Sequence, residues 1–398
     1  MEKTWVNVPD VLFFQEGPGV RNTQYTSDGV KLLNVANLID GNIDLSKSDR
    51  YISEEEAYGK YKHFLCDEGD FIVASSGIKV EYIDKKMGFV ENTMLPLCMN
   101  TSTIRFKSLD QEKLRIRYFM YYLKSNHFKR QLFKQITGSA QLNYGPSHLK
   151  KMMVPLTDIE KQDRIIAELD RTQNIINKYE KELMLLDKLI KARFIELFGD
   201  ILNDKTLPLV RLSELADIGS SKRIYANEYV ESGIPFYRSK EIRELGTGLK
   251  PSVELFIKRE RYNEIREKYG VPKVGDILIA AIGATIGYSW IVDTASPFYY
   301  KDGNLIILSV KDNVNPIFLN HAMGILIEDF KKKGVAGSAQ LALTIEKLEK
   351  MMVVNPELEL QNQFAAFVAQ VDKSKAAVQK ALDETQLLFD SLMQEYFG

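Results

Sequence analysis

No set of reactive side chains in this sequence has the spacing of a catalytic or metal site. The four histidines show neither metal-ligand spacing nor an evident nucleophile partner: His63, His127, His148 and His321. The only Gly-Lys pair, at 59–60, is followed by Tyr61 rather than by the Ser or Thr of a phosphate-binding loop. Residues 17–19 lack the third glycine of a dinucleotide-binding fingerprint. We therefore expect no catalysis and no metal or cofactor in this chain.

A basic segment offers different chemistry, because it contains no Asp or Glu between Lys113 and Thr157. Its cations are Lys113, Arg115, Arg117, Lys124, Lys129, Arg130, Lys134, Lys150 and Lys151. Aromatic residues alternate with them: Tyr118, Phe119, Tyr121, Tyr122, Phe128 and Phe133. Such a mixture can neutralise phosphates and stack on bases. The alternative is a helix with buried aromatics and solvated charges, which we prefer for the aromatics. Lys331–Lys333 forms a second basic group, diluted by Glu328 and Asp329.

The basic groups lie ahead of motifs that recur at a spacing of 199 residues, half of the 398-residue chain. The recurring pairs are Gly138–Leu142 with Gly337–Leu341, Lys151–Val154 with Lys350–Val353, and Phe198–Gly199 with Phe397–Gly398. All three hold one offset without a gap. Solenoid repeats have periods of about 20–50 residues. The longer period predicts two copies of one domain.

A long helix is predicted at the end of each copy, since residues 158–198 contain neither proline nor glycine. Seam positions step by four and three at Ile165, Leu169, Thr172, Ile176, Tyr179, Leu183, Leu186 and Ile190. The second copy matches at Phe364, Val368, Val371, Lys375, Val378, Leu382, Thr385 and Phe389. This period predicts an antiparallel intramolecular coiled coil of about 40 residues, roughly 60 Å long, with polar residues that fix its register. Two separate helices, each packed on its own domain, are the alternative.

The segments ahead of the helices read as mixed α/β domains with many short strands. Glu68–Gly77 resembles Val274–Gly283, and Gly29–Asn34 parallels Gly233–Arg238. Here the alignment needs gaps, and the polar residues between the shared apolar ones differ. We expect one scaffold with two different surfaces.

Composition narrows the class of protein further. A net charge of −1 means that any nucleic-acid site must come from local clustering. Cys66 and Cys98 have no ligand-like neighbours, so we expect neither a disulfide framework nor zinc. The absence of an apolar run of 18 residues and of a signal-peptide start predicts a cytoplasmic protein.

The order of these features resembles the specificity subunit of type I restriction–modification systems. The resemblance is carried by the two Gly-Asp-apolar strands, the Gly233–Arg238 stretch, the Gly-Ser-Ala-Gln loops and Glu16–Asn22. Val154–Leu156 and Asn355–Glu357, followed by Gln162 and Gln361 at the helix starts, complete it. The resemblance covers essentially the whole chain. It implies target-recognition domains at 1–157 and 200–355, with spacer helices at 158–199 and 356–398.

The resemblance also implies a function. Such a subunit is not an enzyme, and its domains read the two halves of a gapped double-stranded DNA sequence. It docks two methyltransferase subunits, which bring S-adenosylmethionine and methylate adenine N6. A restriction subunit that uses ATP and Mg²⁺ joins the complex.

Candidate DNA-binding residues are donors on loops that could enter the major groove. In the first domain they are Arg21, Asn22, Gln24, Ser75, Ser76, Lys79, Lys129, Arg130, Lys134, Ser139, Gln141 and Asn143. In the second they are Ser221, Lys222, Arg223, Arg238, Lys240, Thr285, Asn304, Lys331, Lys332, Lys333, Ser338 and Gln340. The Ser and Gln of the shared loops favour backbone contact or loop structure over discrimination between bases.

Two alternatives remain open at this point. One is a nuclease or methyltransferase whose site has no recognisable motif. The other is a coiled-coil scaffold whose domains bind proteins or non-specific nucleic acid.

Overall fold

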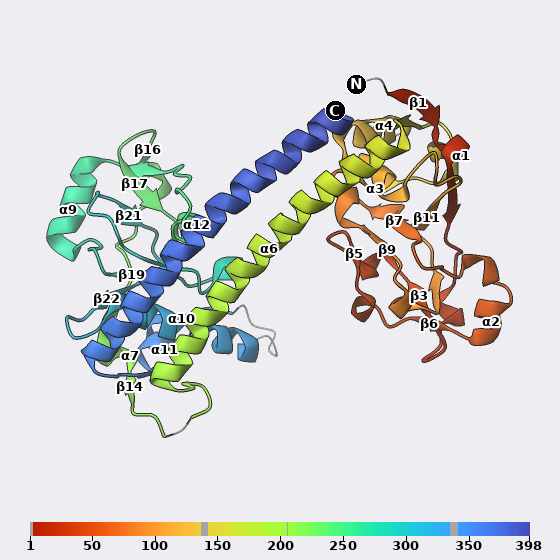
Figure 1. Ribbon diagram of the computed structural model, residues 1–398. Helices are drawn as coiled ribbons and strands as arrows, with labels where there is room; N and C mark the ends of the chain where they lie inside the picture. The colour runs from red at the N-terminus through yellow and green to blue at the C-terminus, as the bar shows by residue number, and fades with distance from the viewer. Residues whose placement is uncertain (1–2, 137–141, 205, 335–340) are drawn as a thin grey trace. The chain divides into compact units, whose positions relative to one another are not determined.

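The computed structural model describes residues 3–136, 142–204, 206–334 and 341–398. These residues form two compact units. Unit 1 contains residues 1–180 and 380–398, and unit 2 contains residues 181–379. Each unit therefore combines one α/β domain with a stretch of both long helices (Figure 1).

Unit 1 is built around a four-stranded antiparallel sheet with the order β2-β11-β7-β9. Its strands are β2 (Leu12–Glu16), β11 (Thr103–Ser108), β7 (Phe71–Ala74) and β9 (Met87–Phe89). Successive side chains of a strand point to opposite faces. Phe71 and Phe106 therefore enter the main aromatic core, while Ile72 and Ala74 enter a second core on the other face.

Smaller elements complete unit 1. A parallel pair joins β3 (Val30–Leu33) to β10 (Leu97–Met99), with β6 (Tyr51–Ile52) antiparallel on the other side of β3. Further antiparallel pairs are β1 (Thr4–Asn7) with β13 (Met153–Leu156), β4 (Leu38–Ile39) with β5 (Asn42–Ile43), and β8 (Ser76–Ile78) with β12 (Leu142–Asn143). The short helices are α1 (Val8–Val11), α2 (Glu54–Tyr58), α3 (Ile116–Lys124), α4 (Asn126–Gln135) and α5 (Pro146–Leu149).

Unit 2 repeats the sheet as β15-β22-β19-β20. The strands are β15 (Ala216–Gly219), β22 (Leu305–Val310), β19 (Ile277–Ala280) and β20 (Ser289–Ile291). A parallel pair, β17 (Ile234–Tyr237) with β21 (Tyr299–Tyr300), matches that of β3 with β10. The remaining strands are β14 (Leu209–Arg211), β16 (Tyr229–Val230), β18 (Phe256–Ile257) and β23 (Met352–Val354). The helices are α7 (Leu212–Leu215), α8 (Ser239–Gly246), α9 (Arg259–Tyr269), α10 (Pro316–Gly334) and α11 (Ile345–Glu349). Two copies of one mixed α/β framework are therefore confirmed.

One helical region differs between the copies. In unit 1, Ser125 separates α3 from α4, and its hydroxyl accepts a hydrogen bond from Phe128 N (3.2 Å) as the cap of α4. In unit 2 the corresponding chain is the single helix α10.

The two long helices are α6 (Ile159–Phe198) and α12 (Leu358–Phe397). Asp158 begins α6 by accepting a hydrogen bond from Lys161 N (2.8 Å), and Gly199, with φ +78°, ends it. The predicted seam positions are buried or half-buried along both helices. Apart from Gln162 and Gln361, most polar residues at the other positions are exposed, so the seam is the stripe that each helix buries.

The helices pack antiparallel within each unit. In unit 1 the start of α6, with Ile165 and Leu169, shares a core with Phe389 and Phe397 from the end of α12. In unit 2 the end of α6 meets the start of α12, where the rings of Phe198 and Phe364 lie 5.5 Å apart. The predicted coiled-coil pairing is therefore confirmed, and each helix ends in the core of the unit formed by the other copy.

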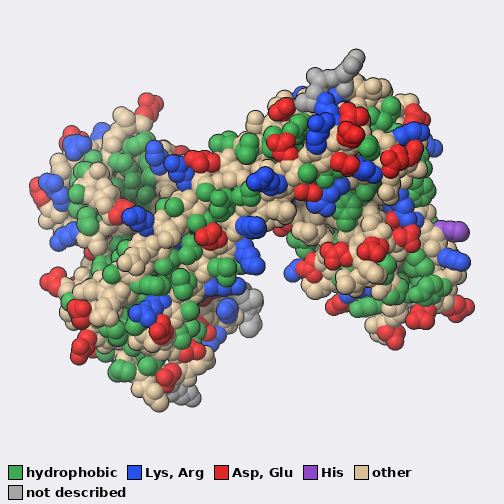
Figure 2. All heavy atoms as spheres, viewed as in Figure 1, with side chains coloured by type: hydrophobic (Ala, Val, Ile, Leu, Met, Phe, Trp, Pro, Cys, Tyr) green, Lys and Arg blue, Asp and Glu red, His purple; other side chains and the backbone are tan. Residues whose placement is uncertain are grey.

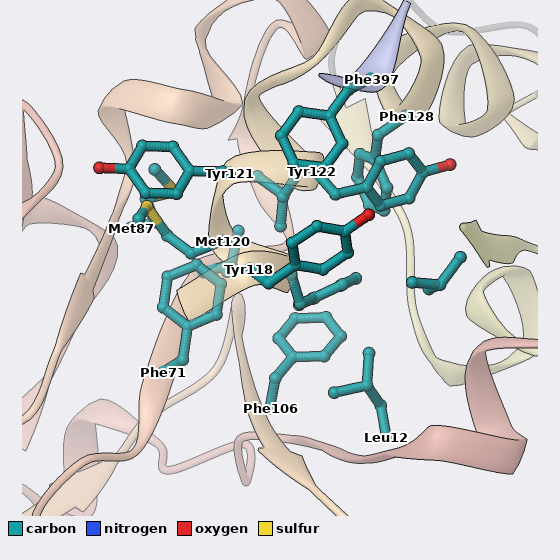
Figure 3. Packing of buried hydrophobic residues seen from close by; sticks show 14 of the residues in the cluster. Leu12, Phe71, Met87, Phe106, Tyr118, Met120, Tyr121, Tyr122, Phe128 and Phe397 are labelled. Atoms are coloured by element: carbon teal, nitrogen blue, oxygen red, sulfur yellow. The ribbon is translucent and has the colours of Figure 1, made fainter. Parts of the chain in front are cut away.

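Figure 3 shows the end of α12 in the core of unit 1, where Phe397 lies above Tyr122 and beside Phe128. The ring of Phe397 is 5.1 Å from that of Tyr118. In unit 2 the equivalent residue, Phe198, is 4.7 Å from Phe318. These two phenylalanines are the last residues of their helices, so the shared Phe-Gly motif is a packing motif.

Two buried glutamines tie the starts of the long helices to the segments that precede α3 and α10. Gln162 accepts a hydrogen bond from Arg115 N (3.0 Å) and donates to the carbonyls of Lys113 (2.8 Å) and Thr157 (2.9 Å). Gln361 accepts from Asn315 N (2.8 Å) and donates to the carbonyl of Pro356 (2.8 Å). The same side chain makes the same type of clamp in both copies.

Polar seam residues are also satisfied. The hydroxyls of Thr172 and Thr385 donate to carbonyls one turn back in their own helices. Lys375 of α12 pairs with Asp187 of α6 at 2.7 Å, which fixes the register of the two helices in unit 2.

The preferred alternative for the basic segment is correct for five of its six aromatic residues. Tyr118, Phe119, Tyr121, Tyr122 and Phe128 are buried, whereas Phe133 is 68% exposed. The positive charge of the segment is also partly neutralised within unit 1. Arg115 pairs with Asp163 and Arg117 with Asp170, each at 2.8 Å. Asp163 and Asp170 of α6 therefore balance part of the positive charge of this segment.

No helix in the described part of the chain is long and apolar enough to span a membrane.

Candidate nucleic-acid interface

Four loops of unit 1 meet beside the four-stranded sheet. Gly17 N donates to Thr103 O (2.9 Å), Ser75 N donates to Ser102 O (2.8 Å), and Tyr144 N donates to Ser75 O (3.0 Å). A Cβ at Gly17 would lie only 1.9 Å from Asn100 O, so this close approach requires glycine. We call residues 17–22, 75–79, 100–103 and 142–145 the first loop cluster.

Unit 2 forms a similar arrangement, in which two of these three backbone bonds have a counterpart. Ala281 N donates to Asn304 O (2.8 Å) and Leu343 N donates to Ala281 O (2.9 Å). The chain also turns at a glycine of positive φ in each copy, at Gly77 (+76°) and Gly283 (+70°). Residues 219–223, 281–287, 299–304 and 341–343 are the second loop cluster.

The first loop cluster presents several of the predicted DNA-binding residues. Arg21, Asn22, Lys79 and Asn143 are exposed there, and Ser76 is half-buried. Exposed donors of these types can reach base edges or phosphates.

Two other predicted residues of the first domain are held by the protein itself. Ser75 is fully buried, and its hydroxyl has no hydrogen-bond partner among the described residues. The amide of Gln24 donates to Glu56 Oε1 (2.6 Å) and to Tyr61 Oη (3.0 Å). Gln24 thereby anchors the loop that carries Arg21 and Asn22.

The second loop cluster holds Lys222 and Arg223 at its surface. Arg223 Nε pairs with Asp302 at 2.7 Å, and this partner raises the pKa of the guanidinium. Lys222 N donates to Tyr299 Oη (2.7 Å), which fixes the backbone at this point. The other predicted residues here are half-buried: Ser221, Thr285 and Asn304.

Arg238 and Lys240, at the start of α8, are ion-paired within unit 2. Arg238 binds Glu241 (2.9 Å) and Glu254 (2.8 Å), and Lys240 binds Glu254 (2.7 Å). The hydrogen bonds from Lys240 and Arg238 lower the pKa of Glu254 to about 2. DNA would have to compete with these carboxylates for both cations.

The predicted basic residues lie on helices next to the shared loops. On α4, Arg130 and Lys134 are exposed, and Lys129 pairs with Asp84 at 2.9 Å. On α10, Lys333 pairs with Asp329 at 2.6 Å, while Lys332 is exposed and Lys331 half-buried. Figure 2 shows cations and carboxylates interspersed over the visible face. The remaining predicted residues lie outside the described residues: Ser139, Gln141, Ser338 and Gln340.

The sequence did not reveal the buried polar residues that support the first loop cluster from the interior of unit 1. Asn100 is fully buried, and its amide donates to Asn34 Oδ1 (2.8 Å) and to Tyr25 Oη (3.4 Å). Asn34 donates in turn to Leu32 O (2.9 Å). These asparagines lie 66 residues apart, and the parallel between Gly29–Asn34 and Gly233–Arg238 places an arginine where Asn34 stands, so the sequence contains no signal for the pair.

The described residues contain no group of three His, Cys, Asp or Glu side chains that could hold a metal ion. Each copy has one loop cluster, and both clusters stand on the same framework. The protein therefore has two related domains that are suited to binding.

A sequence profile of the type I restriction modification DNA specificity domain matches residues 24–185 and 205–385. Both copies are thus covered, and the chain belongs to the family of type I restriction–modification specificity subunits, with two DNA-recognition domains.

Relatives agree with this assignment. A putative type I restriction enzyme specificity subunit of Haemophilus influenzae is 26% identical over 294 residues, which cover 72% of this chain and 71% of the relative. The type I restriction enzyme MjaVIII specificity subunit of Methanocaldococcus jannaschii is 24% identical over 354 residues, covering 80% and 78%.

Solved structures support the fold. The S subunit of a type I restriction–modification system from M. genitalium has a TM-score of 0.57 at 16% identity, over 100% of this chain and 96% of that chain. A chain from a study of complex assembly and conformational transition of the type I R-M system has a TM-score of 0.56 at 17% identity, over 99% and 97%.

Proposed function

We propose that the domains at 1–157 and 200–355 each read one half of a gapped, two-part DNA sequence. The observation that carries this proposal is the pair of loop clusters. Two equivalent backbone hydrogen bonds recur in both clusters, but the side chains that the clusters present differ. One framework with two sets of exposed donors suits a partner with two related but unequal sites.

The exposed residues of the clusters are the proposed readers. Arg21, Asn22, Lys79 and Asn143 serve the first half-site, and Lys222 and Arg223 serve the second. Arg and Lys recognise guanine edges, and Asn recognises adenine edges. Arg130, Lys134 and Lys332 contact the DNA backbone, which fixes register and orientation without reading sequence.

The helices at 158–199 and 356–398 act as the spacer that sets the gap between the half-sites. Half-site separation is a geometric property of the protein, with one DNA turn spanning about 34 Å. The buried seams and the Lys375–Asp187 pair support a spacer of fixed register.

The chain has no catalytic role in this proposal. Two methyltransferase subunits bind to it and modify adenine N6, using S-adenosylmethionine. A restriction subunit, which uses ATP and Mg²⁺, joins through them. Extrusion of the target base belongs to the methyltransferase.

Co-expression with its neighbouring methyltransferase gene, followed by genome-wide mapping of N6-methyladenine, tests the proposal. We expect one gapped motif with two defined halves. Random methylation, or one continuous motif, would contradict it. Purified chain that cleaves or methylates DNA alone would favour an enzyme. If the assembled complex fails to bind DNA at any salt concentration, a protein-binding scaffold is favoured instead.

A further inference from the structure

A buried arginine holds together the acidic turn of unit 1. Arg105, only 5% exposed, donates from Nη1 to Asp70 (3.0 Å) and Leu65 O (2.7 Å). Its Nη2 donates to Gln15 Oε1 (2.5 Å) and His63 O (2.9 Å). The guanidinium therefore has four acceptors, one of them a carboxylate.

The same turn exists in unit 2 with the same backbone bonds. Asp67 N donates to Asp70 Oδ2 at 2.9 Å, and Lys273 N donates to Asp276 Oδ2 at 2.8 Å. The glycine just before this aspartate, Gly69 in unit 1 and Gly275 in unit 2, has a positive φ. Its N–H donates to the carbonyl of the valine that directly follows the neighbouring strand. Asp276 is thus the counterpart of Asp70.

The register of the strands identifies the counterparts of the cations. Phe71 pairs with Phe106 in unit 1, and Ile277 pairs with Leu308 in unit 2. Arg105 and Lys107, on either side of Phe106, therefore correspond to Ile307 and Ser309. Unit 2 has kept the carboxylate and lost both cations that bind it in unit 1.

In unit 2 a cavity of about 850 Å³ lies beside Asp276 and Ile307, at the place that corresponds to the Arg105 side chain in unit 1. Each of the four residues that accept a hydrogen bond from Arg105 has its counterpart in the cavity wall. These counterparts are Gly219 for Gln15, Tyr269 for His63, Val271 for Leu65 and Asp276 for Asp70. Ile307 and Ser309 line the same cavity.

Asp276 is 8% exposed at this wall, and no described cation forms an ion pair with it. Desolvation raises the pKa of Asp276 even though Lys273 N, Ser309 and the charge of Lys273 favour its ionised form. Two further lysines of the wall are engaged elsewhere. Lys222 lies over the ring of Tyr269 (5.2 Å), and Lys311 donates to Ser213 O (3.0 Å).

Ser221 is a further polar residue of the wall, and its buried hydroxyl has no hydrogen-bond partner among the described residues. Buried hydroxyls of folded proteins normally have a protein or water partner, so this group is an exception that lies at the cavity.

We propose that this cavity of unit 2 is a binding site for a guanidinium cation, held by Asp276 in the place that Arg105 occupies in unit 1. A planar guanidinium can donate two parallel bonds to one carboxylate, which is the strongest arrangement for such a pair. The cation comes either from free arginine-like molecules or from an arginine side chain of another protein.

Thermal unfolding and calorimetric titration of the full chain with methylguanidinium chloride test the proposal, against sodium chloride at equal concentration. We expect a saturable rise in Tm for the wild type, because the ligand binds only the folded state. Asp276→Asn should weaken binding by at least about tenfold, the equivalent of losing a charge-assisted hydrogen bond.

Two further variants keep the result decisive. Ile307→Arg places an arginine at the position of Arg105 and should abolish binding by occupying the cavity, even if Asp276→Asn does not fold. Asp312→Asn removes an exposed carboxylate from the same wall and should leave binding unchanged.

Titration with L-arginine and with N-acetyl-L-arginine amide separates the two sources, since the amide imitates an arginine within a protein chain. Preferential binding of the first indicates a free ligand, and of the second an arginine of another protein. No effect of methylguanidinium beyond that of sodium chloride, or an equal effect in Ile307→Arg, would overturn the proposal.

Discussion

Asp70 and Asp276 occupy the same turn in the two domains, but their surroundings differ. Asp70 contacts Arg105 and Lys107, whereas the equivalent positions beside Asp276 are Ile307 and Ser309. The backbone bonds of the turn are unchanged. After duplication the backbone frame was therefore retained, while the side chains on one face of the sheet were free to change. The loop clusters likewise share a backbone arrangement but differ in their exposed side chains.

The largest effect is expected from removing the buried cation of unit 1. Arg105→Ala leaves Asp70, 2% exposed, without its buried partner, and should destabilise unit 1 by about 3–5 kcal/mol. Hydrogen exchange of β7 and β11 measures this change. Lys107→Ala is the control, because its ammonium is one-third exposed and should contribute at most about 1 kcal/mol. Equal effects of the two substitutions would show that burial of the pair is unimportant.

Each long helix ends in the core of the unit that contains the other copy's domain, so a substitution at a helix end should destabilise that other unit. Phe397→Ala removes a ring from the core of unit 1 and should cost about 3 kcal/mol there. Phe198→Ala should have a similar effect on unit 2, although residue 198 ends the helix that follows the first domain. Hydrogen exchange resolved by segment distinguishes the units. If each substitution weakened only the domain that precedes its helix, the assignment of these cores would be wrong.

The buried glutamines should behave alike in both copies. Gln162→Ala and Gln361→Ala each leave a buried backbone N–H without its acceptor, at a cost of about 1–3 kcal/mol. Chemical denaturation followed by the m value and midpoint measures the loss. Replacement by Glu, which keeps the acceptor but not the donor, should recover only part of the stability. A strong effect in one copy alone would contradict the equivalence of the two clamps.

The smallest expected effect is the pH dependence that Asp276 gives to the stability of unit 2. Burial raises the pKa of Asp276, so its stabilising contribution is present below the ordinary aspartate pKa and is lost as pH rises through the raised value. Asp276→Asn should therefore make unit 2 more stable than the wild type at neutral pH, with the difference vanishing in acid. Urea unfolding at pH values from about 3 to about 8, a range that begins below the ordinary aspartate pKa, measures this difference in stability. A constant difference at all pH values would refute the linkage.

The helices were predictable because their signal is local and repeated. Seam positions from Ile165 to Ile190 recur every 3.5 residues, and any burial of that stripe requires a matching partner. The shared framework was also predictable, since Gly69 and Gly275 mark the same turn in both copies.

The loop clusters were only partly predictable, because their contacts join distant residues. In the second cluster Arg223 pairs with Asp302, which lies 79 residues away, and in the first cluster Tyr144 N donates to Ser75 O. No spacing rule predicts such pairs. The cavity beside Asp276 was missed for a related reason: it becomes visible only when the strand register aligns Ile307 with Arg105.

Exchange of one domain is the most direct test of whether each domain reads its own half of the DNA site. Residues 1–157 would be replaced by the equivalent domain of another family member, and N6-methyladenine would be mapped after co-expression with the methyltransferase. We expect one half of the methylated motif to change, while the other half and the gap remain. A change in both halves, or in neither, would contradict this expectation.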